Sequence, residues 1–129
     1  MVKEGMMPEP NEIDREIAEK VMGWLLEIDG EAGRDWWRDK SGYKQWEYTW
    51  HPSTDIAQAF QVVEKMREQD YWFSIVYGTE MPRDGEEVLP PAWWARFRCV
   101  QGGTRLDGYD HADTPEMAIC KAALKAVQK

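Results

Sequence analysis

The chain has 129 residues, 43% of them hydrophobic and 31% charged, a balance that excludes wholesale disorder and low-complexity architecture and fits one folded domain. Its formal net charge of -8 would repel a phosphate backbone, and its Lys and Arg residues form no cluster, so we expect no direct binding to nucleic acid. No apolar run approaches the ~20 residues that a membrane-spanning helix needs, which argues against a membrane protein.

The N-terminal residues carry no targeting signal that we can recognise. Residues 1–9 hold one proline, lack a basic-then-apolar layout and show no periodicity, so we expect a flexible terminus followed by a single domain over residues 10–129. The expected location is the cytosol. Cys99 and Cys120 agree with this, because both fall at apolar positions and predict buried free thiols rather than a disulfide.

The first element predicted along the chain is a helix that begins near Asn11 and ends near Gly23. Asn11 is a good N-cap residue, and an apolar stripe follows at fourfold spacing: Ile13, Ile17 and Val21. Residues 24–50 then alternate short aromatic stretches with turn residues. This pattern predicts a small antiparallel meander, although Gly33 and the charges around it could equally form a loop.

A second helix is predicted directly after Pro52. Ser53 or Thr54 would cap it, and polar residues fill the positions between its apolar ones. We expect its buried stripe to consist of Ile56, Ala59, Phe60, Val63 and Met66.

The C-terminal half predicts a second set of strands. Residues 71–77 and 91–100 are rich in aromatic and β-branched side chains, and a last short strand is expected near residues 105–111, after a Gly102-Gly103 turn. The polar, acidic segment 78–90 is predicted to be a mobile loop, and it is long for a hairpin connection.

The closing helix has clear start signals. Thr114 is the expected N-cap, Pro115 occupies the first helical position, and one apolar stripe follows: Met117, Cys120, Leu124 and Val127. The predicted order is therefore helix, two or three strands, helix, two or three strands, helix. Such an order favours an α+β fold, with an antiparallel sheet sandwiched by helices.

Several strings spread over the chain resemble the phage ABA sandwich domain of Firmicute phages and prophages. They are EKVMGW at residues 19–24, WHPSTDIA at 50–57, VVEKM at 62–66, ADTP at 112–115 and AICKAAL at 118–124. The order of elements is also similar, more weakly, to that of NinX-type phage proteins. The resemblance implies a small α/β sandwich encoded in phage genomes and supplies no activity, so function has to be argued from a site.

This chain departs from the family pattern in two places. The family typically has an asparagine where this chain has His51, and the loop at 78–90 is longer than the usual form. Neither departure touches the signals that predict the helices.

No combination of residues predicts catalysis or a metal. His51 and His111 lie far apart in sequence without metal-ligand spacing, and the carboxylates around His111 lack the calcium-loop pattern. No nucleophile motif or phosphate-binding glycine loop is present. We therefore expect a protein that is not an enzyme and that needs neither a metal nor a cofactor.

The eight tryptophans are the most unusual feature of the composition. Because neighbours in a strand point to opposite faces, the adjacent pairs Trp36-Trp37 and Trp93-Trp94 cannot send both rings to one side of a sheet. Helices on both faces would bury both rings. Exposed rings beside arginines would instead offer a stacking surface, and the residues predicted to form it are Trp93, Trp94, Arg96, Arg98 and Arg105.

These residues lead to two competing functions for a non-enzymatic phage accessory protein. The first is a host-defence antagonist that binds a small anionic, nucleotide-like ligand at the aromatic and arginine residues. The alternative is an acidic protein that inhibits a basic, nucleic-acid-binding host factor by imitating nucleic acid. A chain this small with surplus tryptophan could also form a homodimer.

Overall fold

The computed structural model describes most of the chain. The described residues are 10–29, 34–42, 44–79, 90–101 and 104–127. The N-terminal segment predicted to be flexible, residues 1–9, lies outside them.

The helices and strands follow one another in the predicted order. In chain order they are α1 (Pro10–Glu16), the π-helical η1 (Ile17–Val21), β1 (Leu25–Asp29), β2 (Arg34–Arg38), β3 (Lys44–Trp46), the 3-10 helix η2 (Glu47–Thr49), α2 (Ile56–Glu68), β4 (Trp72–Gly78), β5 (Ala92–Gln101), β6 (Thr104–Ala112) and α3 (Pro115–Val127).

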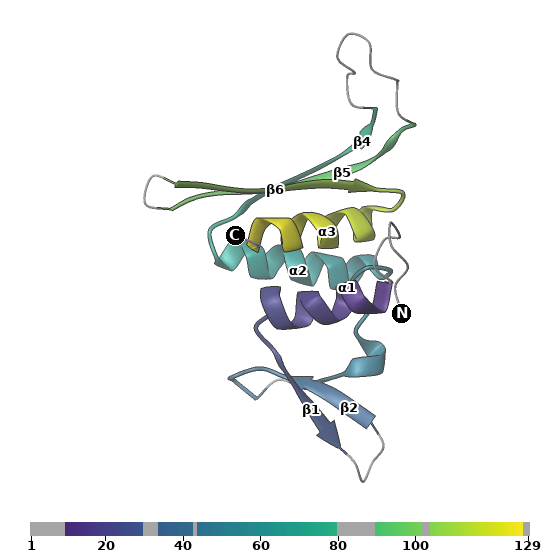
Figure 1. The fold of residues 1–129 in the computed structure, drawn as a ribbon, viewed down its shortest axis with the longest axis vertical. Coiled ribbons are helices and arrows are strands. Elements are labelled where there is room, and N and C mark those ends of the chain that lie inside the picture. The colour runs from purple at the N-terminus through teal and green to yellow at the C-terminus, as the bar shows by residue number, and fades with distance from the viewer. Residues whose placement is uncertain (1–9, 30–33, 43, 80–89, 102–103, 128–129) are drawn as a thin grey trace, which may run out of the picture.

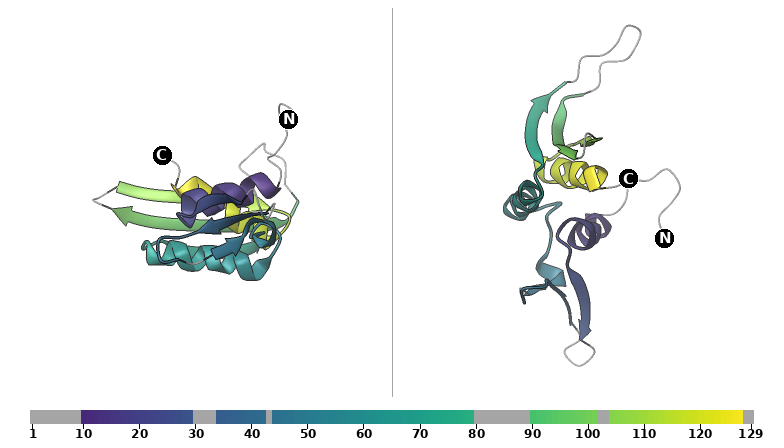
Figure 2. Two further views of the ribbon diagram at one scale, coloured as in Figure 1. Left: turned by 90° about the horizontal axis from the view of Figure 1, so that it is seen from below. Right: turned by 90° about the vertical axis from the view of Figure 1, so that its left-hand side faces the viewer.

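The helices form a middle layer with an antiparallel sheet on either side (Figures 1 and 2). The N-terminal sheet has the strand order β1-β2-β3 and the C-terminal sheet the order β4-β5-β6. The α+β class and the antiparallel pairing are as predicted. The layering differs from one sheet covered by helices on both faces, because α2 separates the two meanders along the chain and each meander closes into its own sheet by local hairpins.

The predicted first helix is confirmed. It runs from Pro10 through Val21, its last five residues adopt π-helical geometry, and its apolar stripe is buried. Gly23 follows at a φ of 74°, in the left-handed region that glycine adopts without strain, so the chain can turn there into β1.

Helix α2 is confirmed, with two corrections. Its cap is Asp55, whose carboxylate accepts a hydrogen bond from the Gln58 backbone N–H at 3.1 Å, rather than Ser53 or Thr54. The buried stripe is Ala59, Val62, Val63 and Met66, whereas Ile56 and Phe60 are largely exposed. The buried face differs from the predicted one because α2 packs mainly on α3, which covers Val62 and leaves Ile56 and Phe60 largely exposed.

Helix α3 starts as predicted and packs unusually close to β6. The Thr114 hydroxyl accepts a hydrogen bond from the Met117 N–H at 3.3 Å, and Pro115 is the first helical residue. Facing the helix, Gly108 lies so near that a Cβ there would overlap the Ala122 carbonyl oxygen and the Ala126 backbone nitrogen. The alanine-rich face of α3 and this glycine together let the helix approach the sheet backbone. None of the described helices combines the length and apolarity needed to cross a bilayer.

The strands predicted in the C-terminal half are confirmed at nearly the predicted positions. The third of these strands, β6, is longer than expected. It pairs with β5 along its whole length, with Ala112 opposite Trp93 at one end and Thr104 opposite Gln101 at the other. The predicted Gly102-Gly103 turn and residues 80–89 of the predicted mobile loop lie outside the described residues.

A cluster of buried tryptophans joins the N-terminal sheet to the helices. Trp24 and Trp50 pack with ring centroids 4.6 Å apart, Trp37 is buried beside them, and the Trp50 indole N–H donates to the Asp14 backbone carbonyl at 3.1 Å. Trp36, next to Trp37, packs instead on Trp46 at a centroid distance of 4.9 Å and stays partly exposed. The prediction that this adjacent pair divides between two faces is confirmed.

Candidate functional site

The C-terminal sheet has one face toward the helices and one face that no described helix covers (Figure 1). Trp93, Ala95 and Phe97 belong to the helix side, because they lie in or against the core. Their alternate neighbours on three paired strands form the opposite side, here called the outer face. The outer face consists of Trp72, Ser74 and Val76 of β4, Trp94, Arg96 and Arg98 of β5, and Asp107, Tyr109 and His111 of β6.

Three of the five residues predicted from sequence come together on the outer face: Trp94, Arg96 and Arg98. Trp93 does not join them, because it lies on the helix side, where its ring packs on Tyr77 at a centroid distance of 5.1 Å. Arg105 lies on β6 opposite Val100, and its side chain is outside the described part of the chain.

The ring of Trp94 is held in place by its neighbours and is not open for stacking. It is only 8% exposed, although no helix covers it, because it is held between Tyr109, with centroids 5.4 Å apart, and His111, at 4.5 Å. Its indole N–H donates to the Gly78 carbonyl at 3.1 Å. Because Tyr109 and His111 pack on its ring, Trp94 supports the site but is not itself open to a ligand.

Arg96 places a positive charge over the ring of Tyr109. Its guanidinium carbon lies 4.9 Å from the centroid of the Tyr109 ring, a cation–π distance, and its Nε lies 3.4 Å from Asp107 Oδ1. Within the described residues this Nε is buried without a hydrogen bond of good geometry. Arg96 is therefore positioned by an aromatic ring and a carboxylate, with hydrogen-bonding capacity left over.

Trp72 and Arg98 form the most accessible part of the outer face. They are direct cross-strand neighbours, Arg98 is exposed, and the Trp72 side chain is 82% exposed. Sequence reasoning did not single out Trp72. The signal was available in the alternation of the strand, since Tyr71 and Phe73 on either side of Trp72 both pack inward.

A hollow of about 540 Å³ adjoins Trp72 where α2 ends and β4 begins. It is lined by Val63, Arg67, Asp70, Tyr71, Trp72 and Phe73. Arg67 is engaged by Glu64 at 2.6 Å, and Asp70 holds the left-handed φ of 68° that turns the chain from the helix into the strand. The volume of this hollow lies within the range of small-molecule sites.

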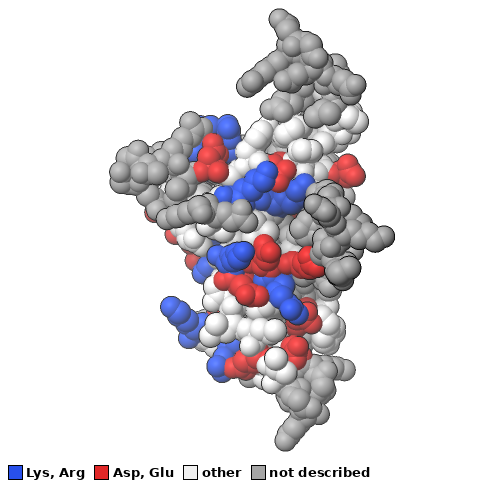
Figure 3. Space-filling model, in the orientation of Figure 1, with Lys and Arg blue, Asp and Glu red and all other residues white. Residues whose placement is uncertain are grey.

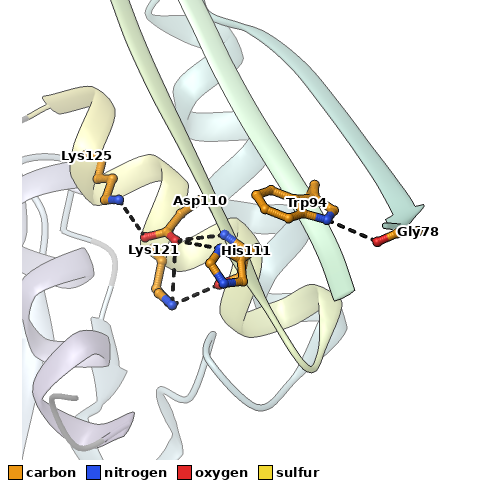
Figure 4. A network of polar contacts seen from close by, with 6 residues as sticks. All are labelled: Gly78, Trp94, Asp110, His111, Lys121 and Lys125. Atoms are coloured by element: carbon orange, nitrogen blue, oxygen red, sulfur yellow. Dashed lines mark hydrogen bonds and ion pairs between the residues drawn. The ribbon is translucent and has the colours of Figure 1, made fainter. Parts of the chain in front are cut away.

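A polar network next to the outer face fastens α3 to β6 (Figure 4). Asp110 contacts the ammonium groups of Lys125 at 3.1 Å and Lys121 at 3.6 Å, and Lys121 also donates to the His111 carbonyl at 2.8 Å. Burial alone would raise the pKa of Asp110, but the hydrogen bond from the His111 N–H and the two ammonium groups outweigh it and hold that pKa below its ordinary value. We interpret these charges as structural.

The described residues offer no metal-binding group, and their two thiols are buried. No group of three or more His, Cys, Asp or Glu residues within them could hold a metal ion. Cys99 and Cys120 are buried free thiols, and burial raises the pKa of the Cys120 thiol well above its usual value, which disfavours the reactive thiolate.

Comparison with known proteins gives one finding. A family model described as the phage ABA sandwich domain matches residues 15–124. Neither the curated proteins nor the solved structures contain a significant match to this chain.

Proposed function

This chain belongs to the phage ABA sandwich domain family, and we propose that it acts for its phage as a non-enzymatic binder of a small anionic, nucleotide-like ligand. The outer face of the C-terminal sheet is the proposed site. The observation that carries the proposal is the exposed cross-strand pair of Trp72 and Arg98.

The pair combines the two contacts that a nucleotide needs. A ring as open as Trp72 can stack on a base, and stacking on an aromatic side chain is worth about 1–3 kcal/mol per base. Arg98 opposite it, and Arg96 two residues along the same strand, can donate charge-assisted hydrogen bonds to a phosphate. Because the whole chain carries a charge of -8, these arginines favour a small anion over a long nucleic acid.

Binding such a ligand would suit an antagonist of host defence. A protein without chemistry of its own can still block a nucleotide signal by holding it, provided that its affinity matches the signal's concentration. The proposed setting is the cytosol of the infected bacterium.

The test is a titration with the four common nucleoside diphosphates, followed by native mass spectrometry and calorimetry. The corresponding nucleosides serve as matched ligands without charge. We expect at least one diphosphate to bind with 1:1 stoichiometry. Trp72→Ala and Arg98→Ala should each weaken it about tenfold or more, as the loss of a stacked base or an ionic hydrogen bond implies.

Two control variants separate this site from general surface effects. Tyr48→Ala removes an exposed ring and Arg15→Ala an exposed guanidinium, both far from the outer face, and neither should change the affinity. Binding that survives Trp72→Ala and Arg98→Ala, or no binding of any diphosphate at millimolar concentration, would contradict the proposed function.

The alternative, an acidic inhibitor of a basic host factor, stays a prediction. Its support is the net charge of -8. On the face drawn in Figure 3, however, red and blue side chains are intermixed rather than separated, which does not resemble the continuous negative stripe of nucleic acid. We therefore favour the ligand-binding proposal.

A further inference from the structure

The edges of the two sheets differ in how well they are protected from pairing with another strand. An edge strand presents unpaired backbone N–H and C=O groups, and proteins usually protect it with charges or shortness. Of the four described edge strands, β1 carries Glu27 and Asp29, β3 has three residues, and β6 carries Asp107 and Asp110. By contrast, β4 (WFSIVYG) has seven residues and contains no charge and no proline.

The surroundings of β4 are apolar as well. Besides Trp72, its side chains Val76 and Tyr77 are each 61% exposed. Phe60 of α2 is 46% exposed and meets Phe73 of β4 edge-on at a centroid distance of 6.3 Å. A strand added at this edge would therefore find apolar contacts in addition to backbone hydrogen bonds.

We propose that β4 pairs antiparallel with β4 of a second copy, which makes the protein a symmetric dimer with a continuous six-stranded sheet. The two-fold axis would pass beside Ile75, so Ser74 of one copy would lie opposite Val76 of the other. Because the strand is uncharged, self-pairing sets no like charges opposite each other, whereas β1 or β6 would bring carboxylates together.

The surface that this pairing would bury is small but approaches that of a specific interface. A buried aromatic side chain removes about 150–250 Å² from water, so covering the exposed parts of Tyr77 and Phe60 would bury on the order of 300–500 Å² over two copies. Trp72 would lie opposite Gly78 of the second copy, which has no side chain, so its ring stays open to a ligand. Val76 and the paired backbones bring the total toward the ~1,000 Å² that a specific interface requires. An interface of this size lies at the low end for specific contacts, as in a weak, reversible dimer.

The experiment compares molar masses by sedimentation over a concentration series of the wild-type chain and two double variants. Ser74→Lys with Val76→Lys would set four ammonium groups against one another across the pairing. Both positions are exposed, so the fold should persist, which circular dichroism checks. Leu25→Lys with Ile28→Lys is the matched control, because it adds the same charges at exposed positions of the edge strand β1.

We expect the wild type and the control to reach twice the 15.1 kDa chain mass at about 100 µM, where a dissociation constant near 1 µM gives mostly dimer. The folded Ser74→Lys, Val76→Lys variant should keep the mass of one chain. Hydrogen exchange at the β4 amides should slow as concentration rises in the wild type and in the control, but not in the Ser74→Lys, Val76→Lys variant. A wild type that stays monomeric, or a dimer that survives the β4 lysines, would overturn the proposal.

Discussion

Gly108 is the residue at which the packing of β6 against α3 leaves least room. Replacing it with alanine should be severe, because the new Cβ would meet backbone atoms of Ala122 and Ala126 rather than a side chain that can move. Overpacking of a core typically costs about 1–3 kcal/mol, and we expect Gly108→Ala to lower the free energy of unfolding by about 3 kcal/mol or more. Urea denaturation measures it.

The control for this variant is Ser74→Ala, at an exposed position of the same sheet. It should change the free energy of unfolding by about 0.5 kcal/mol or less. If Gly108→Ala proved equally mild, the close approach of α3 to the sheet would be wrong.

At the scale of the elements, Asp110 should make the attachment of α3 to β6 depend on pH. Its pKa is lower in the folded chain than in the unfolded one, so ionised Asp110 stabilises the fold above the unfolded value of about 3.9. That contribution is lost as the pH falls through the folded pKa. Asp110→Asn should therefore lower the free energy of unfolding at neutral pH by about 1.5–3 kcal/mol, as for hydrogen bonds to charged groups, and much less in acid.

Urea denaturation of the wild type and Asp110→Asn at several pH values between about 7 and 3 checks this expectation across the ordinary titration range of aspartate. Asp113→Asn, at an exposed position just before α3, is the matched control and should show no such convergence. A stability difference that stays constant down to acid pH would show that the ionic contacts of Asp110 do not hold the helix.

At the scale of the whole molecule, one core connects both sheets through the helices. Trp37 of the N-terminal sheet and Phe97 of the C-terminal sheet belong to the same buried cluster. Trp37→Ala should therefore destabilise the entire chain, by about 3–5 kcal/mol for the loss of a buried aromatic side chain. Hydrogen exchange should show amides of β2 and β5 losing protection together, as expected of a single domain.

Trp46→Ala is the control for that experiment. Trp46 packs at a tilt on Trp36 outside the core, so its loss should cost clearly less than the loss of Trp37. Two separate unfolding transitions, with β2 opening while β5 stays protected, would contradict the single domain predicted for residues 10–129.

Part of the candidate site was predictable and part was not. Trp94, Arg96 and Arg98 were found from sequence, because aromatic rings beside arginines predicted a stacking surface, and the alternation of the strand places these three on one face. Trp93 was included although the same alternation sends it to the opposite face. Trp72 was missed, although its inward-packing neighbours Tyr71 and Phe73 offered the signal, and only the tertiary structure shows that no described helix covers its face.

By itself, the sequence determined what depends on local physics: the start of α3, the order of helices and strands, the division of each tryptophan pair between two faces, and the family. Only the tertiary structure decided how these elements are layered, with helices between two sheets, since hairpins form locally but the packing of their faces joins distant segments. The same reason explains Gly108, which reads as an ordinary strand glycine until α3 lies against it.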